Sequence, residues 1–184
     1  LLRIDVDQST EELPYGIPED NPLLGQPGAM PEVWAVGLRN PWRGAFDPAT
    51  GDLWIGDVGN FRWDNVFQLP AGTGSGTNFG WPTVNGVSPD GTLVCWNPRP
   101  DCNSEGILEP LLSEFIGGCG AILGGYVYRG SCVEQLQGHF VYADFCKRWV
   151  HSVELLEGKP MRHDWTETLD PERQLTPLVS LGRD

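Results

Sequence analysis

Short runs in which apolar and polar residues alternate recur along this chain, and they restrict its fold more than any other feature. The alternation has a period of two, and the runs are rich in β-branched and aromatic residues, as is typical of half-buried β-strands. Glycine and proline residues, which favour turns, lie between them. We therefore expect a strand in each of five segments, at residues 32–36, 52–55, 125–128, 139–142 and 148–153.

The turns between these runs predict two hairpins. Pro48 and Gly51 lie in the first turn, where proline sets one backbone angle and glycine accepts a positive one. The second turn is a longer loop that ends at Gly138. The predicted pairs are residues 42–46 with 53–55 and residues 126–128 with 140–142, and a further strand is expected after Lys147.

The composition supports an all-β fold. The chain has 24 glycine, 16 proline and 8 tryptophan residues among 184, so turns are frequent and large aromatic side chains can fill the space between sheets. Successive strands without a helical period between them favour a β-sandwich or a β-propeller. At about 40–50 residues per propeller blade, the chain would hold about four blades. Residues 72–77 and 85–112 are expected to be loops, the second a long insertion.

Charge and cysteine content narrow the class of protein. Acidic residues outnumber basic ones 25 to 12, and the formal charge of −13 repels phosphate backbones, so nucleic-acid binding is not expected. Residues 115–128 carry no charge, but this segment is too short and glycine-rich for a membrane-spanning helix. Five cysteines without a Cys-x-x-Cys pair favour disulfides and a periplasmic or secreted location. Residues 1–5 read as the middle of a strand without a signal peptide, so we expect the chain to begin inside a longer protein.

Three segments carry polar side chains that could form a site. Arg39 and Asn40 offer a guanidinium fork and an amide to a carboxylate, although a structural salt bridge would also account for the arginine. The loop at residues 55–64 is rich in aspartate and glycine, which suits a hard cation such as calcium or aspartates that cap turns. Lys147, before a strand, could meet an anionic ligand or lie in solvent.

The three histidines, His139, His151 and His163, are scattered along the chain. Their spacing is not typical of a zinc site, and no nucleophile or base pattern surrounds them. We therefore predict that all three are structural or exposed.

Four blocks of sequence together resemble one family. They are residues 2–5 with 20–22, residues 31–43, residues 51–59 with 78–82, and residues 124–130 with 136–138. In this order they are similar to the soluble glucose and aldose sugar dehydrogenases, and to the hedgehog-interacting-protein-like proteins of the same fold. The resemblance implies a six-bladed β-propeller of four-stranded antiparallel blades that binds pyrroloquinoline quinone and calcium. Residues 1–184 would be a partial propeller from its middle and later blades.

The resemblance also implies roles for particular residues. Calcium would be held by the backbone carbonyls of two neighbouring residues, Gly59 and Asn60. The catalytic base would be a histidine that lies before this sequence. The side chains implied to contact the quinone are Arg39, Asn40, Asp64 and Lys147.

Several positions depart from the glucose dehydrogenase pattern. Val58 and Asn60 stand where that pattern has a polar residue and a proline, Asn65 replaces a glutamate that holds a second calcium, and Cys119 replaces a threonine that contacts the cofactor. Related bacterial proteins have cysteines near positions 119 and 146. The resemblance therefore implies a Cys119–Cys146 disulfide, with Cys132 to Cys146 as an alternative. Cys95 and Cys102 would close the long loop if they are oxidised, and Cys132 is left over in the first scheme.

Two functions follow. The first is an oxidoreductase that oxidises the anomeric hydroxyl of an aldose and passes the electrons to an external acceptor. The second is a secreted, non-enzymatic propeller of the hedgehog-interacting kind. Its acidic face and long loop would bind a protein or a glycan, with Trp96 as the anchor.

Overall fold

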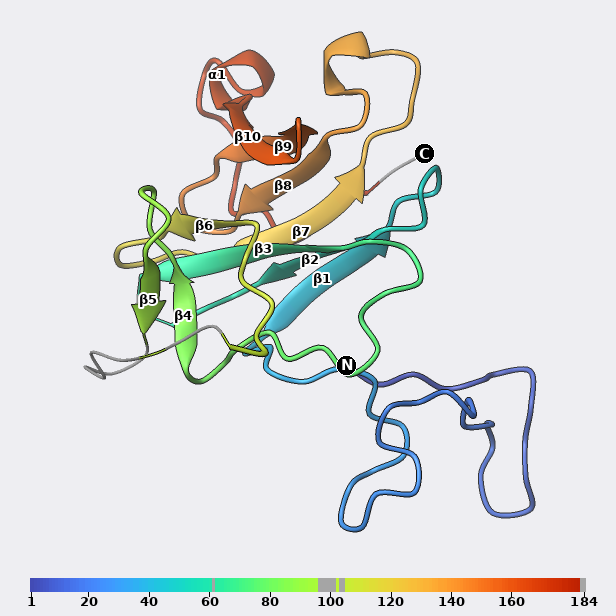
Figure 1. Ribbon diagram of the computed structural model, residues 1–184. Helices are drawn as coiled ribbons and strands as arrows, with labels where there is room; N and C mark the ends of the chain where they lie inside the picture. The colour runs from blue at the N-terminus through green and yellow to red at the C-terminus, as the bar shows by residue number, and fades with distance from the viewer. Residues whose placement is uncertain (61, 96–101, 103–104, 183–184) are drawn as a thin grey trace.

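The computed structural model describes residues 1–60, 62–95, 102 and 105–182, and they fold almost entirely as antiparallel β-structure (Figure 1). The described strands form two four-stranded sheets in the orders β1-β2-β3-β6 and β10-β9-β8-β7, and a two-stranded sheet, β4-β5. The first sheet contains β1 (Pro41–Phe46), β2 (Leu53–Asp57), β3 (Trp63–Leu69) and β6 (Leu112–Phe115). The second contains β7 (Ile122–Val127), β8 (Phe140–Asp144), β9 (Val150–Leu156) and β10 (Lys159–Asp164). The remaining elements are β4 (Val84–Val87), β5 (Leu93–Cys95), the 3-10 turn η1 (Glu134–Leu136) and the one-turn helix α1 (Thr166–Leu169).

Both predicted hairpins are confirmed. Phe46 pairs with Leu53 in the β1–β2 hairpin, and Tyr126 pairs with Val141 in the β7–β8 hairpin. Asp47 forms the first turn by accepting a hydrogen bond from the N–H of Ala49, 3.0 Å away, which is the local bonding that makes aspartate a turn residue. The strand expected after Lys147 is β9.

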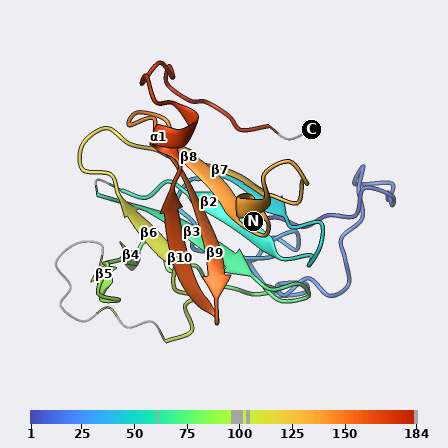
Figure 2. The ribbon, with the colours of Figure 1, turned by 90° about the horizontal axis from the view of Figure 1, so that it is seen from above.

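The two large sheets stack on each other, and Figure 2 shows the second lying over the first. The core between them contains Trp54 and Val66 from the first sheet and Phe140, Tyr142 and Val153 from the second, each at most 4 % exposed. These residues alternate with outward-facing neighbours, as stacked sheets require.

Close approach of the backbones at this interface requires glycine. A Cβ atom on Gly124 of β7 would lie 2.4 Å from the carbonyl oxygen of Arg43 on β1, so a larger residue there would separate the sheets. Each blade has the four antiparallel strands that the resemblance implies, which agrees with the all-β propeller prediction.

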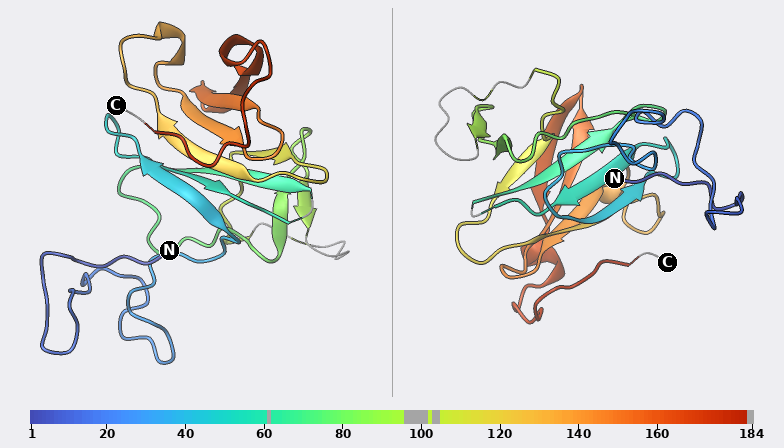
Figure 3. Two further views of the ribbon diagram at one scale, coloured as in Figure 1. Left: turned by 180° about the vertical axis from the view of Figure 1, so that it is seen from behind. Right: turned by 90° about the horizontal axis from the view of Figure 1, so that it is seen from below.

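Three sequence-based expectations differ from the structure. Residues 32–36 are not a strand, because Val33 and Val36 form single bridges with two different segments, at Leu2 and Asn78. Residues 1–5 likewise form only bridges, and loops project from the first sheet over residues 5–32 (Figure 3). The segment 85–112 is not one continuous loop, because β4 and β5 pair within it.

The described residues contain two four-stranded sheets, fewer than the four blades expected from length. The reason is that loops take up most of residues 1–40 and 70–111. No helix among these residues has the length and hydropathy needed to cross a bilayer.

The disulfides are Cys95–Cys102 and Cys119–Cys146. The first closes the loop after β5, and the second joins the loop before β7 to the loop after β8. Cys132 is exposed and free, so the alternative pairing of Cys132 with Cys146 is wrong.

Candidate functional site

One end of the two sheets collects almost every residue that the sequence singled out. Because neighbouring strands are antiparallel, the starts of β1, β3, β7 and β9 lie at the same end as the ends of β2, β6 and β8. A hydrogen bond of 2.7 Å from the N–H of Ile122, at the start of β7, to Asp64, at the start of β3, joins the two sheets there. We call this end the loop end. It carries Arg39, Asn40, Gly59, Asn60, Asp64 and Lys147.

Buried aspartates hold the first-sheet loops in place. The carboxylate of Asp57, 2 % exposed, accepts hydrogen bonds from the N–H groups of Arg39 (3.2 Å) and Asn40 (2.8 Å). The carboxylate of Asp64, 0 % exposed, accepts from the N–H of Gly59 (2.9 Å) in addition to Ile122. Asp64 therefore lies behind the loop and fixes Gly59 through its backbone.

Asp144 does the same for the second sheet. It is fully buried and accepts hydrogen bonds from the N–H groups of Ala121 (3.0 Å), Cys146 (2.7 Å) and Lys147. The loop that carries Lys147 is thus anchored to the start of β7.

The three carboxylates share a poorly solvated environment. Burial raises the pKa of Asp64 to about 6. The hydrogen bonds from the N–H groups of Gly59 and Ile122 lower this pKa, and the charges of Asp144 and Asp57 raise it. Burial also raises the pKa of Asp57. Buried acids whose pKa is raised, as at Asp57 and Asp64, cost stability, and groups of this kind are commonly found at functional sites.

Two cations of the loop end, Arg39 and Lys147, are exposed and retain unused donors. Arg39 donates from Nη1 to the carbonyl of Val58 at 3.1 Å and lies 5.6 Å from the ring centroid of Trp81. Lys147 donates from Nζ to the carbonyl of Phe115 at 3.0 Å. Each uses one N–H on a backbone carbonyl, so the others can bind an anion. The convergence of these two side chains on one ligand stays a prediction.

One of the two expected calcium ligands, the backbone carbonyl of Asn60, does not suit a cation as it is arranged. Gly59 is required by close packing, because a Cβ atom there would lie 1.8 Å from the carbonyl oxygen of Trp63. The carbonyl oxygen of Asn60 already accepts hydrogen bonds from the N–H of Arg62 (2.8 Å) and from Nδ2 of Asn85 (3.1 Å). A carbonyl has two lone pairs, so Asn60 has none left for a metal.

Asn65 belongs to the same hydrogen-bonded network. Its Oδ1 accepts from Ser113 Oγ at 2.6 Å, and its Nδ2 donates to the carbonyl of Asn85 at 3.3 Å. In glucose dehydrogenases, the resemblance places a second calcium ligand at this position. Here the side chain of Asn65 is instead hydrogen-bonded to the hydroxyl of Ser113 and to the backbone carbonyl of Asn85.

Comparisons with known proteins show which family the chain belongs to. Residues 14–173 match the family described as glucose/sorbosone dehydrogenase. The chain belongs to that family. It is 33% identical over 160 residues to the HIPL2 protein of Arabidopsis thaliana, covering 78% of this chain and 22% of that protein. It is 30% identical over 169 residues to the human Hedgehog-interacting protein, covering 91% and 20%.

Enzymes of the glucose/sorbosone dehydrogenase family also match. The aldose sugar dehydrogenase YliI of Escherichia coli is 38% identical over 66 residues, which cover 36% of this chain and 17% of that protein. The crystal structure of the soluble aldose sugar dehydrogenase of Escherichia coli superimposes with a TM-score of 0.62 at 24% identity, covering 81% of this chain and 41% of the other. That structure supports the propeller fold. The chain spans about a fifth of the length of the curated relatives it matches.

Sequence reasoning missed the part played by Asp57 and Asp144. Both end an apolar strand and precede a loop, in the segments Ile-Gly-Asp and Tyr-Ala-Asp. An aspartate at the buried end of a strand is the signal that could have predicted a carboxylate that accepts loop N–H groups.

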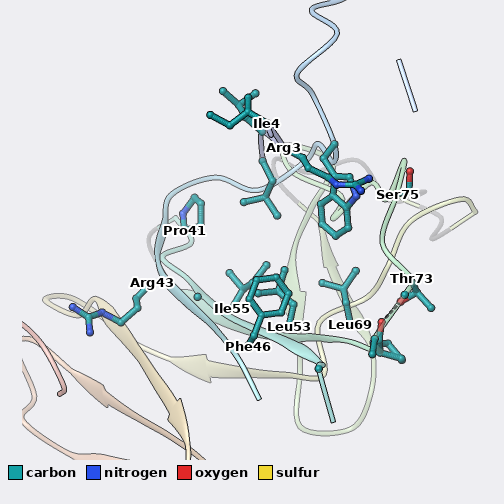
Figure 4. Close-up of a pocket in the computed structure, with 18 of the residues that line it drawn as sticks. Arg3, Ile4, Pro41, Arg43, Phe46, Leu53, Ile55, Leu69, Thr73 and Ser75 are labelled. Atoms are coloured by element: carbon teal, nitrogen blue, oxygen red, sulfur yellow. Dashed lines mark hydrogen bonds between the residues drawn. The ribbon is translucent and has the colours of Figure 1, made fainter. Parts of the chain in front are cut away.

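A cavity of about 850 Å³ lies on the face of the first sheet turned away from the second sheet (Figure 4). Ile55, Leu53, Leu69 and the exposed ring of Phe46 line it. Arg43 points out of it to the second sheet side, where its guanidinium donates to the carbonyl of Leu181 at 2.6 Å. The cavity is lined mostly by apolar residues, with Arg3, Asp20, Thr73 and Ser75 among them, and it lacks the residues that the family resemblance assigns to the cofactor.

Proposed function

We propose that the loop end binds pyrroloquinoline quinone and that the protein is a quinone-dependent aldose oxidoreductase. The observation that supports this is the pair of exposed cations, Arg39 and Lys147, which come from different sheets and keep unused N–H donors at one end of the molecule. The quinone carries three carboxylates, and charge-assisted hydrogen bonds from a guanidinium and an ammonium suit such an anion.

The roles within this proposal follow from the loop geometry. Arg39 and Lys147 would bind carboxylates, and the amide of Asn40 would donate beside Arg39. When bound, pyrroloquinoline quinone supplies the two-electron acceptor for oxidation of a sugar's anomeric carbon. The reduced site would pass its electrons to an external acceptor. We assign no step to calcium, because the carbonyl of Asn60 is already bonded twice.

The base that takes the hydroxyl proton is not assigned to any histidine of this chain. His139 precedes β8 and so lies at the opposite end of the sheet from Lys147. His151 is 6 % exposed and bonded to Glu114 at 3.0 Å, and His163 lies on the outer strand β10.

Binding of the quinone tests the proposal directly. The complete gene product, stripped of metal, is titrated with pyrroloquinoline quinone and followed by equilibrium dialysis, with and without added calcium. Arg39→Gln and Lys147→Gln should each weaken binding by about tenfold or more, since a hydrogen bond to a charged group contributes about 1.5–3 kcal/mol. The matched control is Lys159→Gln, which changes an exposed cation at the start of β10, at the end of the sheet opposite to the loop end, and it should bind like the wild type.

Activity is measured separately, as dye reduction across a panel of aldoses after addition of the quinone. Reduction that depends on sugar and quinone supports the oxidoreductase. Quinone binding that is absent, or that is as strong in Arg39→Gln and Lys147→Gln as in Lys159→Gln, contradicts it.

A second candidate function is a secreted propeller that binds a protein or a glycan without catalysis, like the hedgehog-interacting proteins. The occupied carbonyl of Asn60 favours it, as does the Cys119–Cys146 disulfide, which leaves no hydroxyl at position 119. The two disulfides also support a periplasmic or secreted location. Trp96, the proposed anchor, lies outside the described residues. A wild type that binds no quinone but retains a partner in pull-down from extracellular medium would favour this function.

A further inference from the structure

Two of the three histidines meet a glutamate on one face of the second sheet. The β9–β10 register pairs His163 with Ser152, and the β8–β9 register pairs Phe140 with Val153. Because side chains alternate between faces, His139, Ser152, Glu154 and His163 share the face opposite to the core residues Phe140 and Val153. We call His139, Glu154 and His163 the His–Glu–His cluster.

The possible ligand atoms of this cluster lie close to one another, although not yet at the spacing of a bound metal ion. Nε2 of His163 lies 2.8 Å from Oε1 of Glu154, and Nε2 of His139 lies 3.4 Å from Oε2. One ligand atom from each of the three residues lies within 4.8 Å of the others. Ligands held about 2.0–2.2 Å from a tetrahedral zinc ion are about 3.3–3.5 Å apart, so a modest rotation of the side chains would close the set.

Hydrogen bonds with neighbouring side chains already orient His139. Its Nδ1 lies 2.9 Å from Oγ of Ser152, and the same oxygen accepts a hydrogen bond of 2.7 Å from Nε1 of Trp165. A histidine that binds metal through one ring nitrogen usually donates a hydrogen bond from the other. In the tautomer whose Nδ1–H donates to Ser152, the lone pair of Nε2, which lies 3.4 Å from Glu154 Oε2, would be available to a metal ion.

The cation Arg162 does not compete with a metal ion for the cluster. The neighbouring cation Arg162 is directed to the other face, where it donates to Glu114 at 2.8 Å. The side chain of His163 is 36% exposed and that of Glu154 is 25% exposed, so solvent reaches the cluster and could supply a fourth ligand.

We propose that His139, Glu154 and His163 form a zinc site that ties β8, β9 and β10 together. Two imidazoles and one carboxylate are a donor set that zinc accepts, with water in the fourth position. The site is separate from the loop end: His139 precedes β8 and Lys147 follows it, and a strand of this length places them about 15 Å apart. Because the three residues are far apart in sequence, no motif spacing predicted the site.

Calorimetric titration with zinc chloride tests the proposal. The complete gene product is made without a histidine tag, treated with EDTA, dialysed and titrated near neutral pH. We expect one zinc ion per cluster in the wild type. Glu154→Gln and His163→Ala should each weaken the zinc affinity more than about tenfold, because even the loss of a residue that only hydrogen-bonds to a ligand lowers metal affinity by about 10–100-fold. Glu134→Gln, which removes an exposed carboxylate on η1, is the matched control and should bind zinc like the wild type.

Two further readouts keep the result clear if a variant does not fold. Cobalt(II) added to the wild type should give the strong visible absorption of a four-coordinate ion, and zinc should abolish it. The affinity should also fall as the pH is lowered, because an imidazole must lose its proton to bind a metal ion. Absence of zinc binding to the wild type, or binding that Glu154→Gln and His163→Ala leave unchanged, would overturn the proposal. In that case the cluster is a hydrogen-bonded His–carboxylate group only.

Discussion

The buried carboxylate of Asp64 predicts an unusual pH dependence of stability, which Asp64→Asn should remove. Asp64 is 0 % exposed, and burial raises its pKa from 3.8 to about 6 in the folded protein. Between those two values the folded protein keeps a proton on Asp64 that the unfolded chain releases. The unfolded state therefore binds fewer protons, and the free energy of unfolding decreases as the pH rises through this interval.

The size of the effect follows from the same values. At about 1.4 kcal/mol per pH unit, the interval from 3.8 to about 6 corresponds to about 3 kcal/mol. Most of this is lost between about pH 4 and pH 7. Asparagine cannot ionise, so Asp64→Asn lacks this dependence. It carries instead a constant cost of about 1–3 kcal/mol, because its amide can accept from only one of the two N–H groups of Gly59 and Ile122.

Urea unfolding, followed by tryptophan fluorescence at several pH values, measures this difference. The free energy of unfolding of the wild type, minus that of Asp64→Asn, should decrease by about 2–3 kcal/mol from about pH 4 to pH 7. Other titrating groups are present in both proteins and largely cancel. Asp90→Asn is the matched control, because hydrogen bonds from Ser88 and Thr92 lower the pKa of Asp90 to about 2, outside this window. If the curves of wild type and Asp64→Asn run parallel from pH 4 to pH 7, the reasoning about a buried charge at Asp64 is wrong.

Three more predictions concern Glu114, Arg129 and Cys132, which are not among the residues proposed to bind the cofactor. Glu114→Ala should lower the free energy of unfolding by about 3–5 kcal/mol, because the buried Tyr142 hydroxyl, 2.7 Å from Glu114, and the buried imidazole of His151 lose their acceptor; urea unfolding measures it. Arg129→Ala should cost about 2–3 kcal/mol in the same assay, since it removes two charge-assisted hydrogen bonds to Asp47, which is 3 % exposed. Cys132 should be the single thiol that reacts with a thiol reagent in the native, unreduced protein, and Cys132→Ser should abolish the reaction.

These predictions have their own controls. Arg3→Ala breaks an exposed ion pair with Asp20 and should change stability by less than about 1 kcal/mol. A cost for Arg129→Ala no larger than that would contradict the importance of the buried Asp47. A Glu114→Ala variant as stable as the wild type would show that Tyr142 and His151 find other acceptors. Reaction of more than one thiol would contradict the disulfide pairing.

Local patterns predicted the strands that pair with a close neighbour along the chain. The β1–β2 and β7–β8 hairpins were predictable because a turn and two alternating runs lie within one short segment. Residues 32–36 show the limit of this reasoning, since they alternate like a strand but bridge to two separate segments, at Leu2 and Asn78. The alternation indicates an extended backbone and does not identify its partner.

Part of the candidate site was likewise predictable from the sequence and part was not. The sequence, through its family resemblance, indicated Arg39, Asn40, Gly59 and Lys147, and the antiparallel order of the strands placed all of them at one end. It could not show that Asn60 is bonded by Asn85, because 25 residues separate them and the contact depends on how the β4–β5 sheet packs. It also did not show that Asp64 faces inward and bonds the start of β7.

By itself, the sequence determined the β-structure, the hairpins, the acidic charge and the family, because each depends on residue type and short-range order. The tertiary structure alone decided which polar groups satisfy one another. It buried Asp57, Asp64 and Asp144 behind the loops, and it brought His139, Glu154 and His163 together across three strands. The physical reason is that strand pairing and sheet stacking create contacts between distant residues, and those contacts determine burial, protonation and the ligands each side chain can still accept.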